Sequence, residues 1–529
     1  MSRGGADVKT INPLDVVRAL TQRREIALLD LREEARFAEA HPLFAASMPL
    51  GQLEAQVFAR IPRRTTPIVV YDDGEGLVER ASGVLHGLGY SDVRQLDGGL
   101  GAWRAAGLEV FQDVNSASKA FGELVESRRH TPMISAEELQ REFATGGDIV
   151  VVDARRYDEY RTMNIPGSTS VPGAELVLRA AELAPDPATR IVVNCAGRTR
   201  SIIGAQSLIN AGFGSRIVAL RNGTIGWSLA GFALETGADR QPRDDEPLTL
   251  TTSQSSARDV AYRAGVGWVD GPGLAALVAD PDRTTYLFDV RAPEAFEAGH
   301  IAGFRNAPGG QLVQETDAFA PVRGARIVLH DPLQIRADMT ASWLAQMGWD
   351  VFVLEAAAAL PLAIGTAPAE RPDPPGVQTI EAEALAAGLA QGMVLLDLTA
   401  SPERRAGHIP GSRFVLRSDL DRIVPGLPAA RPVALTSPDG FLAAFAARDP
   451  AWDGMPAPLV LNGGTAAWKQ AGRPLLEGLG EALSEPADVY RRPYEGTQNS
   501  AAAMQAYLDW EYGLVDQLRR DRSHRFFVV

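Results

Sequence analysis

The chain is poor in cysteine: Cys195 is the only one among 529 residues, which excludes an internal disulfide and a cysteine-rich metal site. Its 7 histidines form no cluster with metal-ligand spacing, and no glycine-rich phosphate loop with a lysine occurs. No apolar run approaches the length of a membrane span, and residues 1–7 contain neither an apolar core nor a cleavage pattern. We therefore expect a cytoplasmic protein without a cofactor.

Basic residues are also in the minority, since 66 Asp and Glu outnumber 52 Lys and Arg and give a net charge of −14. There is no long block of lysine or arginine, so neither nucleic acid nor an anionic membrane is an expected partner. We attribute the negative charge to solubility. The hydrophobic content of 45% is that of an ordinary globular protein, and the length predicts several domains.

The single cysteine lies where a buried strand should meet a helix. Residues 191–193 form an apolar β-branched run, which predicts a parallel strand, and the apolar spacing over 202–209 predicts a helix. The loop between them would surround Cys195 with backbone N–H groups, the positive end of a helix dipole and the charges of Arg198 and Arg200. Such surroundings lower the pKa of a thiol and favour a thiolate, which is a nucleophile for sulfur or phosphorus. A buried structural thiol is the alternative, and the chemical interpretation requires a sulfur atom that solvent can reach.

A unit of about a hundred residues occurs four times along the chain. Every copy opens with a short apolar strand that ends in aspartate, at 26–30, 149–153, 286–289 and 394–397. Each copy continues to a central strand, at 68–71, 191–194, 327–330 and 433–436. In the first, second and fourth copies a last strand leads into a glycine turn and a tryptophan, namely Trp103, Trp227 and Trp468. Short parallel strands that alternate with helices predict an open α/β sheet with helices on both faces.

These features resemble the rhodanese (sulfurtransferase) superfamily, whose cysteine heads a six-residue loop between a strand and a helix. Many single-domain members carry Cys-x-x-Gly-x-Arg, whereas here Gly197 comes one place early and Arg198 takes the usual glycine position. The resemblance implies four tandem rhodanese-like domains, with Cys195 in the second. It also implies that Cys195 carries a persulfide.

We predict domain limits of 8–112, 131–236, 257–364 and 377–477, followed by a helical tail over 478–529. The polar stretch 115–130 could form a helical linker, 236–256 is a charged and polar connection, and 368–375 is proline-rich and stiff. The tail carries an aromatic amphipathic helix. We expect it to pack on its own chain or on a subunit partner, which leaves a homo-oligomer open, and we do not expect it to bind a cofactor.

Three of the four copies lack the cysteine. Alignment of the central strands places Asp72, Asp331 and Ser437 at the position of Cys195 in the first, third and fourth copies. An aspartate there would repel an anionic donor, and a serine lacks the polarisable sulfur that sulfur exchange requires. These copies are predicted to be scaffolds; the alternative is that they bind the sulfur acceptor or regulate the second copy.

The resemblance assigns roles within the second copy. Cys195 would attack the outer sulfur of thiosulfate, and an acceptor, a thiol or cyanide, would then remove that sulfur. The substrate-binding set would be the rest of the loop, in which backbone amides stabilise the persulfide and an arginine orients the departing sulfite: Ala196, Gly197, Arg198, Thr199, Arg200 and Ser201.

We favour Arg200 over Arg198 for sulfite, although either could instead face solvent or pair with a carboxylate. Ser201 is expected mainly to cap the helix. Arg155 and Glu159 are expected to form a structural ion pair, and Trp227 is expected to be a packing residue.

The predicted function is therefore a thiosulfate sulfurtransferase. A phosphatase or an arsenate reductase is the nearest rival, but related phosphoryl-transfer loops have arginine six places after cysteine, where this chain has Ser201. Two alternatives stay open: a mercaptopyruvate sulfurtransferase, and a persulfide carrier or protein-interaction array with little turnover.

Overall fold

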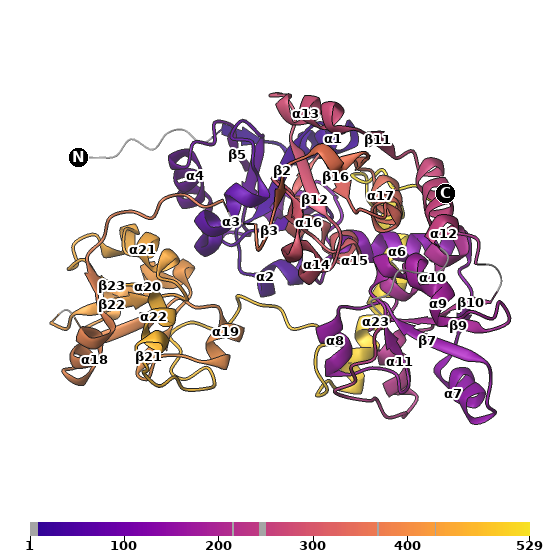
Figure 1. Cartoon of the computed structure of the whole chain (residues 1–529). Coiled ribbons are helices and arrows are strands. Elements are labelled where there is room, and N and C mark those ends of the chain that lie inside the picture. The colour runs from indigo at the N-terminus through magenta and orange to yellow at the C-terminus, as the bar shows by residue number, and fades with distance from the viewer. Residues whose placement is uncertain (1–8, 214–215, 243–249, 368–369, 429) are drawn as a thin grey trace.

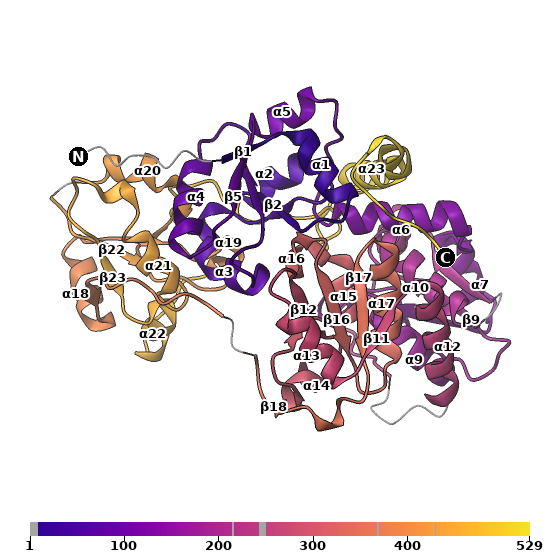
Figure 2. The same ribbon diagram turned by 90° about the horizontal axis from the view of Figure 1, so that it is seen from above.

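A computed structural model describes residues 9–213, 216–242, 250–367, 370–428 and 430–529. They form four α/β units in sequence and a long C-terminal helix (Figure 1). The fourth and second units lie at opposite ends of the molecule, and the first and third lie between them (Figures 1 and 2). None of the helices in these ranges is long and apolar enough to cross a membrane.

The units are defined by their elements. Unit 1 contains β1 (Lys9–Ile11), α1 (Pro13–Thr21), β2 (Ile26–Asp30), α2 (Glu34–Glu39), β3 (Ala46–Ser47), α3 (Leu53–Arg60), β4 (Ile68–Tyr71), α4 (Val78–Gly87), β5 (Val93–Leu96) and α5 (Gly99–Ala105). After α6 (Ser116–Arg129), unit 2 contains β6 (Met133–Ile134), α7 (Ala136–Ala144), β7 (Ile149–Asp153), α8 (Tyr157–Thr162), β8 (Thr169–Ser170), α9 (Leu176–Leu183), β9 (Arg190–Asn194), α10 (Thr199–Asn210), β10 (Ile217–Leu220) and α11 (Gly223–Leu229).

The second half of the chain repeats this pattern with additions. After α12 (Leu250–Arg263), unit 3 contains β11 (Gly267–Val269), α13 (Gly271–Ala279), β12 (Thr285–Asp289), α14 (Pro293–Ala298), β13 (His300–Ile301), β14 (Arg305–Asn306), α15 (Gly309–Gln314), α16 (Thr316–Phe319), β15 (Val322–Arg323), β16 (Arg326–His330), α17 (Ile335–Gln346), β17 (Asp350–Leu354) and β18 (Leu362–Ala363). Unit 4 contains β19 (Thr379–Ile380), α18 (Ala382–Ala390), β20 (Val394–Asp397), α19 (Ser401–Ala406), β21 (Ser412–Phe414), α20 (Leu420–Ile423), β22 (Val433–Thr436), α21 (Phe441–Ala446), β23 (Leu459–Leu461) and α22 (Gly464–Gln470); α23 (Ala501–Arg520) follows.

The main sheets of the four units share one strand order, to which unit 1 adds β15 beside β2. In unit 2 the order is β6-β10-β9-β7-β8, with every pair parallel. The central strands β4, β9, β16 and β22 are those expected from the sequence, and they are almost wholly buried because helices cover both faces of each sheet. The predicted α/β fold class is confirmed. The exact domain limits stay a prediction.

Units 1 and 3 are joined by a strand that the sequence did not reveal. Strand β15 of unit 3 pairs antiparallel with β2 of unit 1, with Val322 opposite Ala27. Gly324 follows with φ +82°, and a Cβ there would lie 2.7 Å from the backbone carbon of Arg24. Because β15 joins the sheet of unit 1, Leu29 of unit 1 and Ile327 of unit 3 belong to a single hydrophobic core.

The connections are more ordered than expected. The predicted helical linker 115–130 is confirmed as α6, but it is largely buried and packs on both α10 and α23. The stretch 236–256 was expected to be a charged and polar connection; its last seven residues begin α12, in which Ser253, Ala257 and Val260 form a buried face against α17. Residues 243–249 and 368–369 lie outside the described ranges. Residues 370–375 have no regular secondary structure, as expected.

The tail packs on its own chain, which is one of the two arrangements that were expected. In α23 the side chains of Tyr507, Leu508, Leu514 and Leu518 are buried, and the helix lies beside α6 (Figures 1 and 2). Beyond it, Phe526 packs edge-on against Phe121 of α6, with ring centroids 5.4 Å apart.

Candidate active site

Cys195 lies at the carboxyl end of β9, and α10 begins four residues later. Its Sγ–H donates to Ser201 Oγ at 3.3 Å, and that hydroxyl donates to the carbonyl of Arg198 at 2.8 Å. The backbone N–H of Ser201 also points to the sulfur. The thiol is therefore held in the predicted strand-to-helix bend, at the positive end of the α10 dipole.

Ser201 does not cap α10, contrary to expectation. The helix begins at Thr199 with Arg198 at the capping position, so Ser201 lies inside the first turn and its hydroxyl bonds to the loop carbonyl. Its contact with Cys195 makes it part of the thiol's surroundings.

Gly223 fixes the shape of this loop. The N–H groups of Thr224 and Ile225 donate to the carbonyls of Cys195 and Ala196, at 2.9 and 3.0 Å. Gly223 has φ +53°, and a Cβ there would overlap the Cys195 carbonyl oxygen. The recurrent glycine turn seen in the sequence therefore supports the loop, while Trp227 is buried and bonds to the Ala233 carbonyl, as expected of a packing residue.

Both loop arginines are paired with carboxylates rather than free for substrate. Arg198 makes two hydrogen bonds to Glu123 of α6, at 2.7 and 2.8 Å, and its guanidinium lies 4.2 Å from the ring centre of Tyr512. Arg200 makes two bonds to Glu159 of α8, at 2.7 and 2.9 Å. The expectation that Arg198 and Arg200 both place an unpaired charge beside the thiol is therefore wrong. Each arginine instead pairs with a carboxylate, which is the alternative that the sequence left open.

The Arg200–Glu159 pair also corrects the expectation for Arg155. Burial alone would raise the pKa of Glu159, but the charge of Arg200 and its hydrogen bonds to the carboxylate lower this pKa to about 2. Arg155 bonds instead to Asp153 and to the carbonyl of Met163. It is a structural residue as predicted, but with a different partner.

The pKa of Cys195 is raised, not lowered as the sequence suggested. Burial is the main cause, and the Glu511 carboxylate adds to the rise, while Arg200 and Ser201 only partly offset it. Cys195 is 2% exposed. The sequence argument counted positive charges near the loop but could not see the carboxylates and side chains that enclose it.

The C-terminal tail provides that enclosure. Tyr507 and Tyr494 pack with Ala196 and Ile225 in one buried cluster. A Cβ on Gly197 would lie 2.9 Å from Oε2 of Glu511 and 3.1 Å from the Tyr507 ring. The early glycine of the loop is thus explained by the tail, which leaves no room for a side chain at this position.

Glu511 is buried beside the loop. Its Oε1 accepts from the Tyr507 hydroxyl at 2.8 Å, while its Oε2 has no hydrogen-bond partner among the described residues. Burial, reinforced by the charge of Glu123, raises the pKa of Glu511 to about 8, although Lys119 and Tyr507 act in the opposite direction. This carboxyl is therefore protonated at neutral pH.

Lys119 of α6 anchors the tail. Its Nζ bonds to Asp113 at 2.7 Å and lies 5.2 to 5.7 Å from the ring centres of Tyr494, Tyr507 and Trp510. Both charged groups are almost fully buried. The linker helix and the tail together close the second unit's loop.

In units 1, 3 and 4 the side chain at the position of the cysteine accepts hydrogen bonds from backbone N–H groups of the loop or helix start that follows it. The Asp72 carboxylate accepts from the N–H groups of Gly74 and Leu77, at 3.1 and 2.7 Å. Asp331 accepts in the same way from Leu333 and Arg336, at 3.3 and 3.0 Å, and Ser437 Oγ accepts from Ala443 at 3.3 Å. These loops direct their amides at this position, and in units 1 and 3 a fixed anion already fills the site.

Sequence reasoning placed the loop 195–201 correctly but missed the groups brought to it from elsewhere. These are Glu123, Tyr494, Tyr507, Glu511 and Tyr512. The displaced Gly197 was the one signal of a close neighbour. No local pattern tells which segment supplies that neighbour.

A family model for the rhodanese-like domain matches residues 14–106, 135–230 and 273–357, which together make up more than half of the chain. The chain belongs to the rhodanese family. The sheet of unit 4 lies outside the matched ranges but has the same strand order as the three rhodanese-like segments.

A crystal structure of a thiosulfate sulfurtransferase from Pseudomonas aeruginosa is 54% identical, covers 99% of this chain and 100% of that one, and superposes with a TM-score of 0.96. A thiosulfate sulfurtransferase from Azotobacter vinelandii is 29% identical over an alignment of 213 residues, and the match covers 36% of this rhodanese chain and 77% of the relative. An HTH-type transcriptional regulator from Mycobacterium tuberculosis is 36% identical over 103 residues, and the match spans only 44% of that relative and 20% of this chain.

Proposed function

We propose that this rhodanese-family protein is a thiosulfate sulfurtransferase that works through a persulfide on Cys195. The observation that carries the proposal is the position of this single cysteine, at the carboxyl end of a central strand and the head of a helix. The full-length similarity to a protein named thiosulfate sulfurtransferase supports the same donor. The acceptor would be a thiol or cyanide.

The reaction has two halves. The Cys195 thiolate attacks the outer sulfur of thiosulfate, a new S–S bond forms, and sulfite leaves with the electron pair of the old one. The acceptor then attacks the outer sulfur of the persulfide and regenerates the thiolate. The Ser201 N–H can hold the anionic sulfur. The Ser201 hydroxyl, which now accepts from Sγ–H and donates to the Arg198 carbonyl, can do so when its hydrogen turns to the sulfur.

Arg200 is a better candidate than Arg198 for the residue that orients the departing sulfite. It is the cation whose field favours the Cys195 thiolate, whereas Arg198 lies between Glu123 and Tyr512. Because Arg200 is bonded to Glu159, it would have to share its donors with the departing anion. The remaining loop residues, Ala196, Gly197 and Thr199, would contribute backbone N–H groups, and the buried Thr199 hydroxyl has no hydrogen-bond partner among the described residues.

Access to the thiol requires movement of the tail. Cys195 is 2% exposed, and Tyr494, Tyr507 and Glu511 pack over its loop. The requirement for a sulfur that solvent can reach is therefore not met in this conformation. We propose that displacement of the tail opens the site.

Intact-mass measurement and steady-state assays test the proposal together. After exposure to thiosulfate, the protein should gain one sulfur atom, and with cyanide it should release sulfite and thiocyanate continuously. Cys195→Ser should abolish both results. Turnover that persists in this variant would show that the site is wrongly assigned.

The buried thiol with a raised pKa favours a second candidate, a persulfide carrier with little turnover. A stable single persulfide without sustained sulfite release would support the carrier. Labelling by mercaptopyruvate but not by thiosulfate would support a mercaptopyruvate sulfurtransferase instead.

A further inference from the structure

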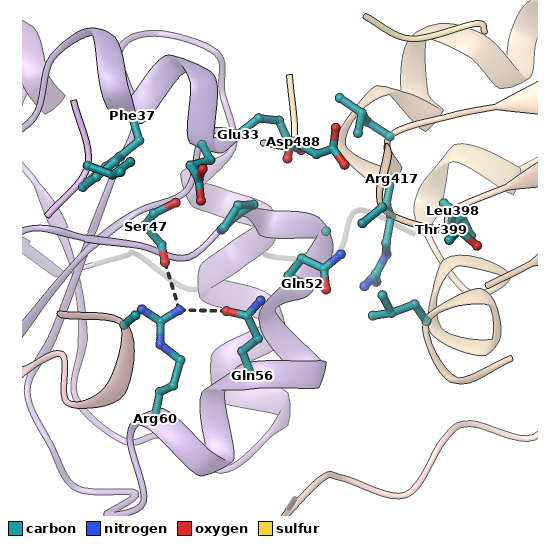
Figure 3. A pocket seen from close by; sticks show the side chains of 18 of the residues that line it. Glu33, Phe37, Ser47, Gln52, Gln56, Arg60, Leu398, Thr399, Arg417 and Asp488 are labelled. Carbon is teal, nitrogen blue, oxygen red and sulfur yellow. Dashed lines mark hydrogen bonds between the residues drawn. The ribbon is translucent and has the colours of Figure 1, made fainter. Parts of the chain in front are cut away.

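A cavity of about 420 Å³ lies between units 1 and 4, and Cys195 is not among the residues that line it (Figure 3). Unit 1 supplies Ser47, Gln56 and Arg60 to one wall, and unit 4 supplies Thr399 and Arg417 to the opposite wall (Figure 3). Unit 3 and the segment before α23 complete the lining. The volume is that of a small-molecule site.

The cavity lies where the carboxyl ends of two parallel sheets face each other. Glu33 and Glu34 follow β2, and Ser47 ends β3, while residues 398–400 follow β20 and residues 415–417 follow β21. Open α/β sheets bind ligands at the carboxyl ends of their strands. Units 1 and 4 lack the cysteine but bring these edges together around one space.

The lining carries an excess of negative charge. Its carboxylates form no ion pair with any residue in the described ranges, and they are Glu33, Glu34, Glu315, Asp317 and Asp488. Three of them bond only to neutral donors: Glu33 to the Ser418 hydroxyl at 2.7 Å, Glu34 to the Tyr490 N–H at 2.9 Å, and Asp488 to the Ser401 N–H at 2.6 Å.

The arginines of the lining do not balance this charge. Arg417 is bonded on both sides by Glu54 and Asp449, and Arg492 is paired with Glu495. Arg60 donates to the Ser47 carbonyl at 2.9 Å and to Gln56 at 2.7 Å (Figure 3), and to the backbone carbonyl of Asp317 at 3.0 Å, but to no carboxylate of the described residues. One guanidinium therefore faces five carboxylates.

Two further observations indicate that the wall is incomplete without another group. Two buried oxygen atoms of lining residues, which could accept from an ammonium group, have no hydrogen-bond partner among the described residues: Thr399 Oγ1 and Asp488 Oδ1. Thr399 is only 3% exposed. Such unsatisfied atoms are uncommon in folded proteins. Burial also raises the pKa of Glu33 to about 7 and that of Asp317 to about 6, and the charge of Arg60 offsets the rise at Asp317 only in part.

The carboxylates are too widely spread for a metal ion. No group of three or more His, Cys, Asp or Glu in the described part of the chain is gathered closely enough to hold one. We propose that this cavity binds a small organic dication or polycation, whose separated ammonium groups contact the carboxylates of units 1 and 3 and of the tail. The site is independent of sulfur transfer and gives the cysteine-less units 1 and 4 a shared binding role.

Isothermal titration calorimetry of the full chain tests the proposal, with putrescine and spermidine as probes. The titration is made at pH 8, where Glu33 and Asp317 are ionised, and at about 150 mM salt, which screens weak surface attraction. We expect one saturable site for either probe and at least tenfold weaker binding of n-butylamine. Affinity should fall as the pH is lowered to 6, because Glu33 becomes protonated.

The variant Glu33→Gln/Asp488→Asn should weaken binding at least tenfold. Its matched control, Glu294→Gln/Glu297→Gln, removes the same charge from the exposed surface of unit 3 and should bind as the wild type does. The cavity variant should unfold at the same temperature as the wild type or higher, since it removes carboxylates that repel each other; Glu34→Gln alone provides a second test if it does not fold. Absence of saturable binding, or equal loss in the surface control, would overturn the proposal.

Discussion

Gly197 is the residue at which the smallest change should have the largest effect on the thiol. In Gly197→Ala the new methyl group would meet Glu511 Oε2 at 2.9 Å and the Tyr507 ring at 3.1 Å, so the tail must shift. We expect a loss of about 1–3 kcal/mol in stability, typical of overpacking, and faster alkylation of Cys195 by iodoacetamide.

Gly83→Ala is the control for this variant. Gly83 lies in α4 with open space around its Cβ position, so alanine there should be neutral or stabilising by about 0.5–1 kcal/mol. Alkylation of Cys195 should not change in the control. An unchanged alkylation rate in Gly197→Ala would contradict the packing of the tail on the loop.

Glu511 should make stability depend on pH in a predictable direction. Burial raises its pKa to about 8 in the folded protein, whereas the unfolded chain ionises near 4.5. The folded state therefore binds one more proton between these values, and the stabilisation, full below pH 4.5, is lost as the pH rises to about 8.

Glu511→Gln should remove this slope, which amounts to about 1.4 kcal/mol per pH unit for one proton. Urea unfolding of both proteins at several pH values between 5 and 8 measures the difference, in which the contributions of other carboxyls cancel. Parallel curves for the two proteins would show that Glu511 does not hold its proton.

For individual residues, the sequence predicted the cysteine and its loop, but it did not predict that the thiol is buried and that its pKa is raised. Cys195, the strand before it and the helix after it follow from local patterns. The partners of Arg198 and Arg200 come from α6 and α8, and Glu511 lies more than three hundred residues further along the chain. Whether an arginine is free or paired depends on these distant contacts, which no local pattern contains.

Among the single helices and strands, α6 connects unit 2, which carries Cys195, to the C-terminal tail, because it packs on both α10 and α23. Lys119→Met would leave the buried Asp113 carboxylate without its cation beneath the rings of Tyr507 and Trp510. Removing one partner of a buried pair costs about 3–5 kcal/mol, so we expect a marked fall in the urea midpoint.

The double variant Lys119→Met/Asp113→Asn should recover part of that loss, because it removes both charges. Lys469→Met, on an exposed face of α22, is the matched control and should change stability by less than about 0.5 kcal/mol. A double variant that is no more stable than Lys119→Met would argue against an energetic pair.

The elements themselves were largely predictable. Strands such as β2, β7 and β20 begin and end where their apolar runs do, because a strand buried on both faces leaves a continuous hydrophobic signal. The two-residue strand β15 leaves no such signal, since its pairing with β2 depends on how units 1 and 3 dock. Helix α12 was missed because its buried residues are mostly small or polar.

At the scale of the whole molecule, Arg417 holds unit 4 to unit 1. It donates to Glu54 at 2.7 and 3.0 Å and to Asp449 at 2.8 Å, with all three side chains buried. Arg417→Met should leave Glu54 uncompensated and loosen the contact between the units. Small-angle X-ray scattering should then show a larger radius of gyration.

Arg371→Met removes an exposed ion pair with Asp439 and serves as the comparison, since such surface pairs contribute about 0–1 kcal/mol. Its scattering curve should match that of the wild type. Identical curves for Arg417→Met and the wild type would show that other contacts are enough to hold unit 4 in place.

The pairing of β15 with β2 has a consequence for synthesis on the ribosome. Part of the outer edge of the first sheet stays open until Val322 and Arg323 have emerged, almost three hundred residues after β2. Until then the nascent N-terminal unit has an unpaired strand edge. Chaperones bind such edges, and chains with unprotected edges aggregate. A stalled chain that ends before residue 322 should be more prone to aggregation than one long enough for residues 322 and 323 to have left the ribosome.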